Sequence, residues 1–329
     1  MNASTSSLSP ARKFGWLLRR EFWENRGGFF WAPVIAGIVI CVLSLLGAIA
    51  GTLHISNLKG EFRLETSADE YVDQLGFIGD GGLLSGVGIV GLVLGFVVFF
   101  YCLGALYDDR RDRSILFWKS MPVSDWLTVL SKLAWALVLG PTLAILIGLV
   151  IGACLMLISA LTMSMIGAPA AWLMIWQSHP IQVTLNALSV VPIYAAWSLP
   201  TVGWLMLCSA FARSKPFLWA VLVPILSATL LSWMGALPGI SMPHGTIWYV
   251  LGYRGLLSIA PGTWYIDSTL VGRLAASAQN IDSPADVMNI IDLSRGWHIF
   301  AGADVWIGMA AGAAMIAAAI WLRKRRDDA

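Results

Sequence analysis

Charged side chains are scarce in this sequence. Asp, Glu, Lys and Arg make up only 12% of the 329 residues, whereas hydrophobic residues make up 58%; an ordinary soluble domain has about 25% charged residues. The formal net charge of +2 gives neither a basic nucleic-acid-binding surface nor an acidic tail. The composition therefore excludes an ordinary soluble domain, and we expect no nucleic-acid partner.

Clusters of metal-binding or disulfide-forming residues are also lacking. The four cysteines stand singly inside apolar runs: Cys41, Cys102, Cys154 and Cys208. The four histidines are equally scattered: His54, His179, His244 and His298. Neither type occurs in pairs at the close spacings that metal sites and disulfide frameworks use. We therefore predict no metal site and read the cysteines as small buried hydrophobes.

Nucleotide-binding and hydrolase motifs are missing as well. The phosphate loop G-x-x-x-x-G-K-[S/T] does not occur, and neither do H-E-x-x-H or G-x-S-x-G. Residues 86–91 fit G-x-G-x-x-G, but they lie in an apolar run with no alternating strands and helices around them. We therefore expect a chain that is not an enzyme, with no catalytic residue and no cofactor of its own.

Long apolar runs dominate what is present, and six of them suit the roughly 20 residues that a helix needs to cross a bilayer. We predict an all-α integral membrane protein with one domain, residues 1–329. The expected transmembrane helices lie at about residues 31–53, 83–106, 126–165, 184–211, 217–237 and 305–322. The third run is too long for one crossing, so it should project from the membrane or bend at Gly140-Pro141. We expect residues 54–82 to form a hydrated outer loop and residues 238–302 a larger outer segment.

The central parts of these six runs contain no Asp, Glu, Lys, Arg or His. Ion-coupled and proton-coupled transporters usually keep an ionisable group at mid-membrane to bind the driving ion. If this chain transports a substrate against its concentration gradient, we therefore expect the energy to be supplied from outside the transmembrane helices.

Four glycine pairs in the runs have the spacing G-x-x-x-G: Gly47/Gly51, Gly91/Gly95, Gly148/Gly152 and Gly308/Gly312. This spacing allows two helices to approach closely, either within one subunit or between two copies.

Residues 11–26 predict an amphipathic helix that lies in the inner headgroup layer. One stripe is apolar: Phe14, Leu17, Leu18 and Phe22. The basic residues lie mostly opposite: Arg12, Lys13, Arg19 and Arg20. Glu21 falls inside the apolar stripe. We expect Glu21 to meet a cation such as Arg110 or Arg113, or else to reach the headgroup water.

The distribution of basic residues predicts the orientation. Sixteen of the 21 lysines and arginines lie in the N-terminal region, in residues 110–132, in the turn at 213–215 and at the C-terminus. Because lysine and arginine favour cytoplasmic loops, both termini should be cytoplasmic.

A charged segment at residues 107–133 separates the second and third runs. Its charges alternate in sign over residues 108–113, and four consecutive apolar residues follow at 115–118. Such a run in a hydrated loop indicates that a partner or the headgroup layer covers it. Pro122 ends one helix, and Ser124-Asp125 begins the next. We therefore predict a short amphipathic cytoplasmic helix between spans two and three.

This segment resembles the loop between the second and third spans of ABC type 2 exporter permeases. The matching residues are Tyr107, Arg110, Leu116, Pro122, Val123, Ser124 and Lys132. The order of the chain is similar too, with a basic N-terminal helix, six spans and a large outer segment before the sixth.

The resemblance implies a coupling helix that contacts a separate ATPase subunit, which would bind ATP and Mg. The implied coupling residues are Tyr107, Asp108, Arg110, Arg111, Arg113, Ile115, Leu116, Phe117, Trp118 and Pro122, with Arg19, Arg20 and Glu21 of the N-terminal helix. It further implies a second copy or a paralogous permease as partner, a bacterial inner (plasma) membrane as location, and membrane lipids around the chain.

The function that follows is the membrane-spanning subunit of an ATP-driven exporter for an apolar or amphipathic cargo, such as a lipid, a peptide or a drug. Two alternatives stay open. One is a membrane enzyme that acts on lipids at the outer face with His and Asp residues of 238–302, and the other is an assembly or sensor protein without transport.

Overall fold

The computed structural model describes residues 9–57, 67–111, 124–235, 237, 243–265 and 293–326. All regular secondary structure in these ranges is helical, which confirms the all-α prediction. Five helical stretches are long and apolar enough to cross a membrane: Pro10–His54, Ala68–Arg111, Asp125–Met165, Pro180–Phe211 and Ala303–Arg325. The fold is that expected of a multi-pass membrane protein.

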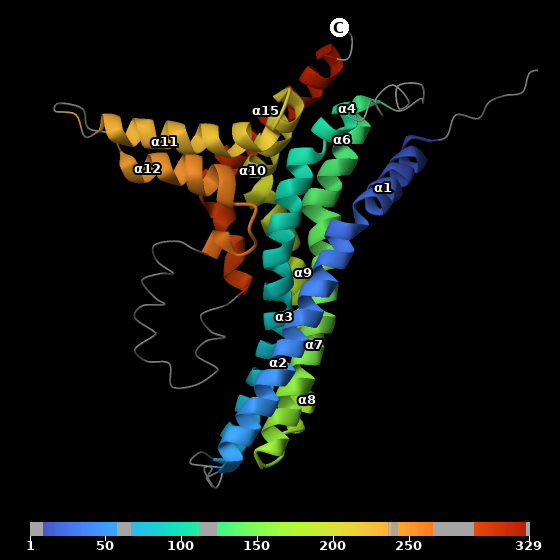
Figure 1. Cartoon of the computed structure of the whole chain (residues 1–329), viewed down its shortest axis with the longest axis vertical. Coiled ribbons are helices and arrows are strands. Elements are labelled where there is room, and N and C mark those ends of the chain that lie inside the picture. The colour runs from blue at the N-terminus through green and yellow to red at the C-terminus, as the bar shows by residue number, and fades with distance from the viewer. Residues whose placement is uncertain are drawn as a thin grey trace, which may run out of the picture.

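The N-terminal helix α1 (Pro10–Arg26) forms where the sequence predicts it. It continues through the π-helical turn η1 (Gly27–Trp31) into the first apolar helix, α2 (Ala32–Asn57). Asn25 has non-helical backbone angles, and α1 leans away from the line of α2 there (Figure 1). Leu17 is buried against the bundle, while Trp16 stays 60% exposed, so the apolar stripe faces inward as predicted.

Helix α3 (Ala68–Gly104) is much longer than the predicted second span. The prediction of a hydrated loop over residues 54–82 is wrong for residues 68–82, which are helical. Ser67 caps the helix by accepting a hydrogen bond from the backbone N–H of Glu70. Tyr71 and Leu75 then bury their side chains against neighbouring helices. Burial of this apolar stripe stabilises the extra turns.

The third predicted span is confirmed as one continuous stretch. It consists of α6 (Asp125–Ala134), the π-helical turn η2 (Trp135–Leu139) and α7 (Gly140–Met165). The π-helical turn lies just before Gly140-Pro141, the position where a bend was expected. A bend was expected there because proline has no backbone N–H to donate to the preceding helical turn.

Helices α3 and α7 lie side by side along the length of the bundle (Figure 1). A Cβ atom on Gly86 would lie 2.3 Å from the carbonyl oxygen of Gly148 and 2.3 Å from the amide nitrogen of Gly152. The two backbones therefore meet directly. The Gly148/Gly152 pair accordingly serves a contact within the chain.

The second half of the bundle is built around α10 (Val191–Phe211), which carries many of the fully buried side chains. The short helices α8 (Leu173–Gln177) and α9 (Pro180–Ser189) lead into it. Helix α15 (Ala303–Arg326) packs along α10, as the predicted sixth span requires.

The predicted fifth span differs from the other five. Residues 217–237 contain η3 (Leu218–Leu222) and α11 (Val223–Met234), and this apolar stretch is shorter than the five long ones. It forms a pair with α12 (His244–Trp248) and η4 (Tyr249–Leu257), and the pair runs across the direction of α3 and α7 (Figure 1). A sixth crossing at these residues therefore stays a prediction.

The predicted outer segment, residues 238–302, is partly helical. Besides α12 and η4, its described part contains the 3-10 helices η5 (Thr263–Tyr265) and η6 (Leu293–Ala301). The turn before η5 packs on α3, where Cβ atoms on Gly91 and Gly95 would contact Pro261 and Ala260. The described part of the segment around Ala260 and Pro261 thus packs directly on α3.

Candidate functional site

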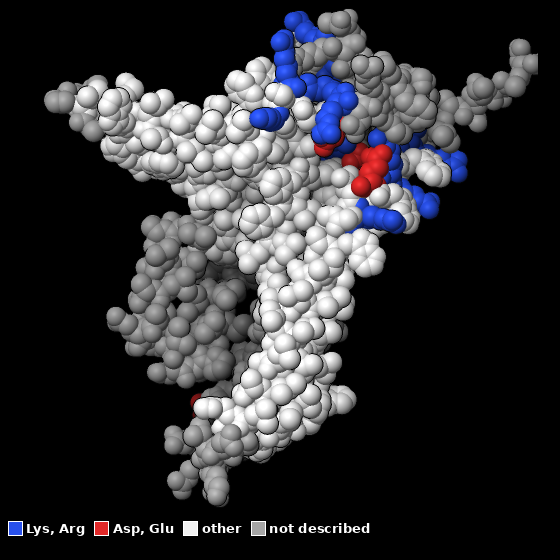
Figure 2. All heavy atoms as spheres, in the orientation of Figure 1, with Lys and Arg blue, Asp and Glu red and all other residues white. Residues whose placement is uncertain are grey.

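Charged side chains gather at one end of the molecule. Figure 2 shows lysines, arginines and acids over the ends of α1, α15 and the short helix α4 (Tyr107–Arg111), while the rest of the visible described surface is almost wholly uncharged. We call this region the charged end. Its buried members are Glu21, Lys132 and Arg323, and the partly exposed Asp109 and Asp125 lie beside them.

Glu21 of α1 and Lys132 of α6 form the centre of the charged end. Their side chains are 1% and 4% exposed, and Lys132 Nζ lies 3.1 Å from Glu21 Oε1. The hydroxyl of Tyr101 donates a hydrogen bond of 2.9 Å to the other carboxylate oxygen. The sequence correctly indicated that Glu21 needs a cation, but Arg110, one of the two suggested partners, is not the one it meets, and the other, Arg113, lies outside the described residues. The cation comes from the third span.

The charges continue from Lys132 to α15. Lys132 Nζ lies 3.6 Å from Asp109, and Asp109 lies 3.3 Å from Arg323 Nη1. Arg323 Nε also pairs with Asp125 at 3.2 Å. Each buried charge therefore has an opposite charge beside it, which is the condition for keeping ions away from water. The ion-pair network connects α1, α4, α6 and α15.

A second set of contacts connects this end of α3 to α10. The buried hydroxyl of Ser209 accepts hydrogen bonds from the backbone N–H groups of Leu106 and Tyr107, at 3.0 and 2.9 Å. The Arg110 guanidinium donates to the carbonyl oxygens of Ser209 and Ala212. Sequence reasoning missed Ser209, because a serine in an apolar run carries no signal of such a role.

The remaining residues predicted for coupling fall into three groups. Tyr107, Asp108 and Arg111 lie in α4 beside the network. Arg19 and Arg20 lie on the outer side of α1, where Arg20 Nε pairs with Glu24 at 2.6 Å and Arg19 lies over the Trp16 ring. The others lie outside the described residues: Arg113, Ile115, Leu116, Phe117, Trp118 and Pro122.

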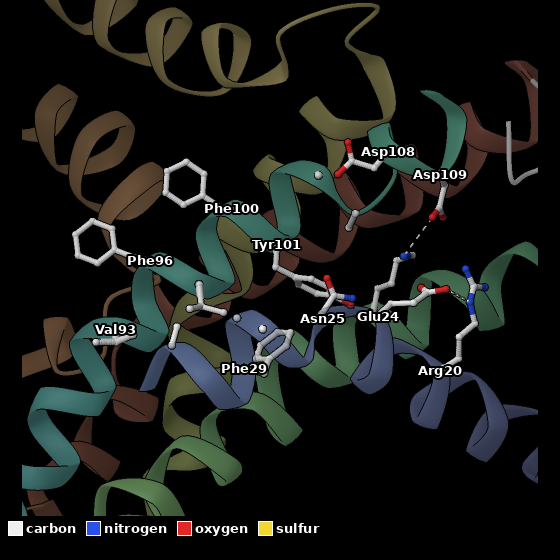
Figure 3. Close-up of a pocket in the computed structure, with 17 residues that line it drawn as sticks. Arg20, Glu24, Asn25, Phe29, Val93, Phe96, Phe100, Tyr101, Asp108 and Asp109 are labelled. Carbon is white, nitrogen blue, oxygen red and sulfur yellow. Dashed lines mark hydrogen bonds and ion pairs between the residues drawn. The ribbon is translucent and has the colours of Figure 1, made fainter. Parts of the chain in front are cut away.

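A pocket of about 920 Å³ adjoins the network, between α1, η1 and α3 (Figure 3). Its walls are apolar and include Phe29, Val93 and Phe96. Arg20, Glu24, Asn25, Asp108 and Asp109 supply its polar part. The pocket therefore offers an apolar surface beside charged groups of both signs, which suits a molecule with an apolar body and a polar head.

One buried charge lies deeper in the bundle. Arg254 of η4 is 6% exposed, with its Cζ atom 3.8 Å from the centre of the Trp197 ring and its Nη1 atom donating to the Trp197 carbonyl at 3.1 Å. Trp197 precedes Ser209 by twelve residues, which is about 18 Å along a helix. The apolar runs themselves contain no such charge, because Arg254 comes from the predicted outer segment at residues 238–302. Its burial against α10 was not predicted, because no pattern in the sequence indicates that this connection packs into the bundle.

Within the described ranges, no group of three or more His, Cys, Asp or Glu residues could hold a metal ion. Comparisons of the chain with protein-family models, curated proteins and solved structures give no match. The class is therefore defined by the fold and the site alone. The described residues form a helical protein with five stretches able to cross a membrane and a network of ion pairs at one end.

Proposed function

We propose that the chain is the membrane-spanning permease subunit of an ATP-driven exporter of the ABC type 2 class, with the charged end in the cytoplasm of a bacterium. The observation that carries the proposal is the position of the ion-pair network. The chain enters residues 112–123 from α4 and leaves them into α6, and both helices contribute to the network. An ATPase that pressed on residues 112–123 would press on both helices.

The ion-pair network would transmit such a force from the loop to the helices of the bundle. Asp109 of α4 pairs with Lys132 of α6 and with Arg323 of α15, and Lys132 pairs with Glu21 of α1. Separating Glu21 from Lys132 would leave the buried Glu21 carboxylate without a cation, which costs several kcal/mol, while Lys132 and Arg323 are each held by two acids. The helix ends therefore move together, and a movement of the loop becomes a tilt of the helices as rigid bodies.

The energy source in this proposal is a separate ATPase subunit that binds ATP and Mg. A cargo with an apolar body and a polar head would suit the pocket of Figure 3, because apolar walls lie beside charged groups there. The proposed location is the plasma membrane, and the excess of lysine and arginine at the charged end supports a cytoplasmic position for it.

A second copy of the chain, or a paralogue, completes the proposed exporter. One glycine pair supports such a contact. A Cβ atom on Gly47 or Gly51 of α2 would meet no neighbouring heavy atom within 4 Å. At Gly148 and Gly152 of α7, by contrast, α3 already fills that space. The open pair leaves a smooth face on α2 for another helix.

The test is co-purification of a soluble ATPase with the tagged chain from its native membrane. We expect an ATPase with a phosphate loop in the eluate, identified by mass spectrometry. The double variant Leu116→Asp/Trp118→Asp should lose the ATPase and still insert into the membrane. Trp176→Asp, at an 83% exposed position of α8, serves as the matched control and should keep the ATPase. Absence of any ATPase from the native complex would overturn the proposal.

A further inference from the structure

The pocket shown in Figure 3 is polar on one side and apolar on the other. In that view, Asp109 and Arg20 lie toward one side, and Val93 and Phe96 lie toward the other. Among the described residues that line the pocket, five are charged: Arg20, Glu24, Asp108, Asp109 and Lys132. A bound molecule would therefore have a defined direction, with its polar group toward the ion-pair network.

The two walls of the pocket are helical stripes that change from polar to apolar in the same direction. One stripe, on α3 and α4, has members three or four positions apart: Val93, Val97, Tyr101, Gly104 and Asp108. The facing stripe, on α1, η1 and α2, has members four positions apart: Arg20, Glu24, Gly28 and Ala32. Residues at these spacings share one face of a helix. An elongated amphiphile can therefore lie along both walls with its head group at the charged end.

Glycine leaves room along the second stripe. Among the described residues, no neighbouring heavy atom lies within 4 Å of the position of a Cβ atom on Gly27, which also lines the pocket. A Cβ atom on Gly28 would lie 3.1 Å from Val97 Cγ1 of the opposite wall. Phe96 and Phe100 line the pocket too, yet they are 71% and 59% exposed. In a membrane, lipid chains would contact these rings, so a lipid can enter the pocket from the side.

Carboxylates outnumber cations in this lining. Among the described lining residues, three are acidic and two are basic: Glu24, Asp108 and Asp109 against Arg20 and Lys132. Both cations already have an acid beside them. Arg20 Nε lies 2.6 Å from Glu24, and Lys132 Nζ lies 3.1 Å from Glu21 and 3.6 Å from Asp109. An anionic head group would have to compete with these carboxylates, whereas a cationic group would be attracted by them.

The accessible acids indicate which kind of cation the pocket favours. The Glu24 side chain is 45% exposed, and Asp108 is also exposed. An ionised carboxylate can only accept hydrogen bonds, and a primary ammonium group has three N–H donors. A quaternary ammonium group has the same charge but no N–H to donate. Because hydrogen bonds between ions are short and strong, the lining favours a primary ammonium.

We propose that this pocket binds one membrane lipid whose head group carries a primary ammonium, with the ammonium beside Asp108 and Glu24 and an acyl chain along the apolar walls. Ethanolamine phospholipids have this chemistry, and Arg20, which also lines the pocket, would lie beside their phosphate. The inference deepens the proposed function by naming the head group. It rests on that function only for the leaflet that supplies the lipid and for the lipid's identity as cargo.

The test uses the full-length chain in lipid nanodiscs and three phospholipids with identical acyl chains, one chain of each carrying a diazirine. The head groups are ethanolamine, choline and glycerol, and each lipid is added at the same mole fraction to unlabelled choline lipid. Mass spectrometry locates the label. We expect the ethanolamine lipid to label peptides that contain residues 27–32 and 93–101 about tenfold more than the other two. Labelling of these peptides at the same level by either of the other lipids would overturn the inference.

Residues 42–49 of α2 are the internal reference for this comparison. Their large apolar side chains are exposed, and they lie outside the pocket of Figure 3. These residues would contact the surrounding lipid whatever its head group, so all three lipids should label them equally. Head-group preference at both places would show a general property of the nanodisc and overturn the site.

Asp108→Asn tests the acid on the polar side of the pocket. The variant removes one charge and keeps the size of an exposed side chain, so folding should be unaffected. We expect the preference for the ethanolamine lipid over the glycerol lipid to fall by about three- to tenfold. Asp69→Asn is the matched control, because Asp69 is an exposed acid at the opposite end of α3. An unchanged preference in Asp108→Asn would overturn the position of the head group.

Gly27→Leu tests the space for the acyl chain. Its side chain can enter the pocket without a clash at Cβ, so labelling of residues 93–101 by the ethanolamine lipid should fall about tenfold. Gly47→Leu in α2 is the matched control, because Gly47 is equally open but lies outside the pocket. Unchanged labelling in Gly27→Leu would overturn the assignment of the chain to this pocket.

This inference and the proposed function fail separately. The labelling is measured without an ATPase, so absence of an ATPase from the native complex would overturn the exporter and leave the lipid site. Equal labelling by the three lipids would overturn the lipid site and leave the exporter, whose test is co-purification of the ATPase.

Discussion

Glu21 and Lys132 place two opposite charges where water does not reach them. Their atoms lie 3.1 Å apart, and Asp109 adds a second acid 3.6 Å from the same lysine. Because Lys132 is the cation beside the buried Glu21, removing it leaves that carboxylate unpaired with Asp109 close by, whereas Asp109 keeps Arg323. Removing Glu21 leaves Lys132 with Asp109 still beside it. Losing the charge of Lys132 should therefore cost more stability than losing that of Glu21, although the two residues form one ion pair.

We predict that Lys132→Met destabilises the chain by about 3–5 kcal/mol, the usual cost of leaving a buried charge unpaired. Glu21→Gln should cost less, since Tyr101 can still donate to the amide oxygen. The double variant Glu21→Gln/Lys132→Met should recover part of the loss. Urea unfolding of the chain in mild detergent measures the differences.

The control is Glu24→Gln, which breaks the more exposed pair between Arg20 and Glu24 on the same helix. An exposed pair of this kind contributes less than about 1 kcal/mol. A loss as large as that of Lys132→Met would show that charge on α1, and not burial of the pair, governs stability.

Asp80 fixes the start of α9 to α3. Its Oδ1 atom accepts a hydrogen bond of 2.7 Å from the backbone N–H of His179, the residue before α9, and its Oδ2 atom lies 3.3 Å from His179 Nδ1. Asp80 is 8% exposed, whereas the His179 side chain is 66% exposed. The backbone contact is therefore the better protected of the two.

We expect Asp80→Ala to cost about 1–2 kcal/mol, the usual effect of losing such a cap. His179→Ala should cost clearly less, because it keeps the backbone N–H. Unfolding curves and limited proteolysis near residues 177–180 would compare the two variants. Equal losses would mean that the side-chain contact dominates.

At the scale of elements, α3 and α7 form the tightest helix contact described above. A Cβ atom on Gly86 would meet backbone atoms at 2.3 Å, and backbone atoms cannot turn away as a side chain would. We predict that Gly86→Ala costs about 1–3 kcal/mol by forcing the helices apart. Gly88→Ala, on the same helix with open space at Cβ, should change stability by less than about 1 kcal/mol in either direction. Similar unfolding curves for both variants would refute this contact.

The elements themselves were largely predictable from the sequence. The apolar runs indicated α2, α7, α10 and α15, because a helix that crosses a membrane needs a long uncharged stretch. The early start of α3 is marked by a helix-capping motif, but the composition of the surrounding residues suggested a loop. Ser67 and Glu70 have the spacing of a capping box, yet the acidic, glycine-rich stretch around them suggested a loop.

The ion-pair network was not predictable to the same extent. The sequence showed that Glu21, inside an apolar stripe, needed a cation. It did not show which one, since the partner depends on how distant helices meet. Asp109 and Arg323 are 214 positions apart, and Asp125 and Arg323 are 198 apart. Local patterns carry no information over such separations, so only the three-dimensional arrangement identifies the pairs.

At the scale of the whole molecule, the two ends of the bundle have different chemistry. Ion pairs hold the charged end together, whereas no charged side chain among the described residues lines the pocket of about 470 Å³ between α3, α7 and α10, near the middle of α3. An exporter that opens alternately to the two sides needs one region that transmits force and another that accommodates a ligand. The proposed function therefore depends on which end faces the cytoplasm.

Orientation can be tested with single cysteines and a membrane-impermeant maleimide. Trp176→Cys lies at an 83% exposed position of α8, and Lys324→Cys lies at the charged end. We expect Trp176→Cys to be labelled in intact cells and Lys324→Cys only after the membrane is permeabilised. The unchanged chain is the control: Cys102 and Cys208 are buried as predicted, Cys41 is partly buried and Cys154 is exposed, contrary to the prediction, but both lie on apolar helix faces that a membrane would cover, so little label is expected. The reverse pattern would put the ion network outside the cell, where no cytoplasmic ATPase could press on it.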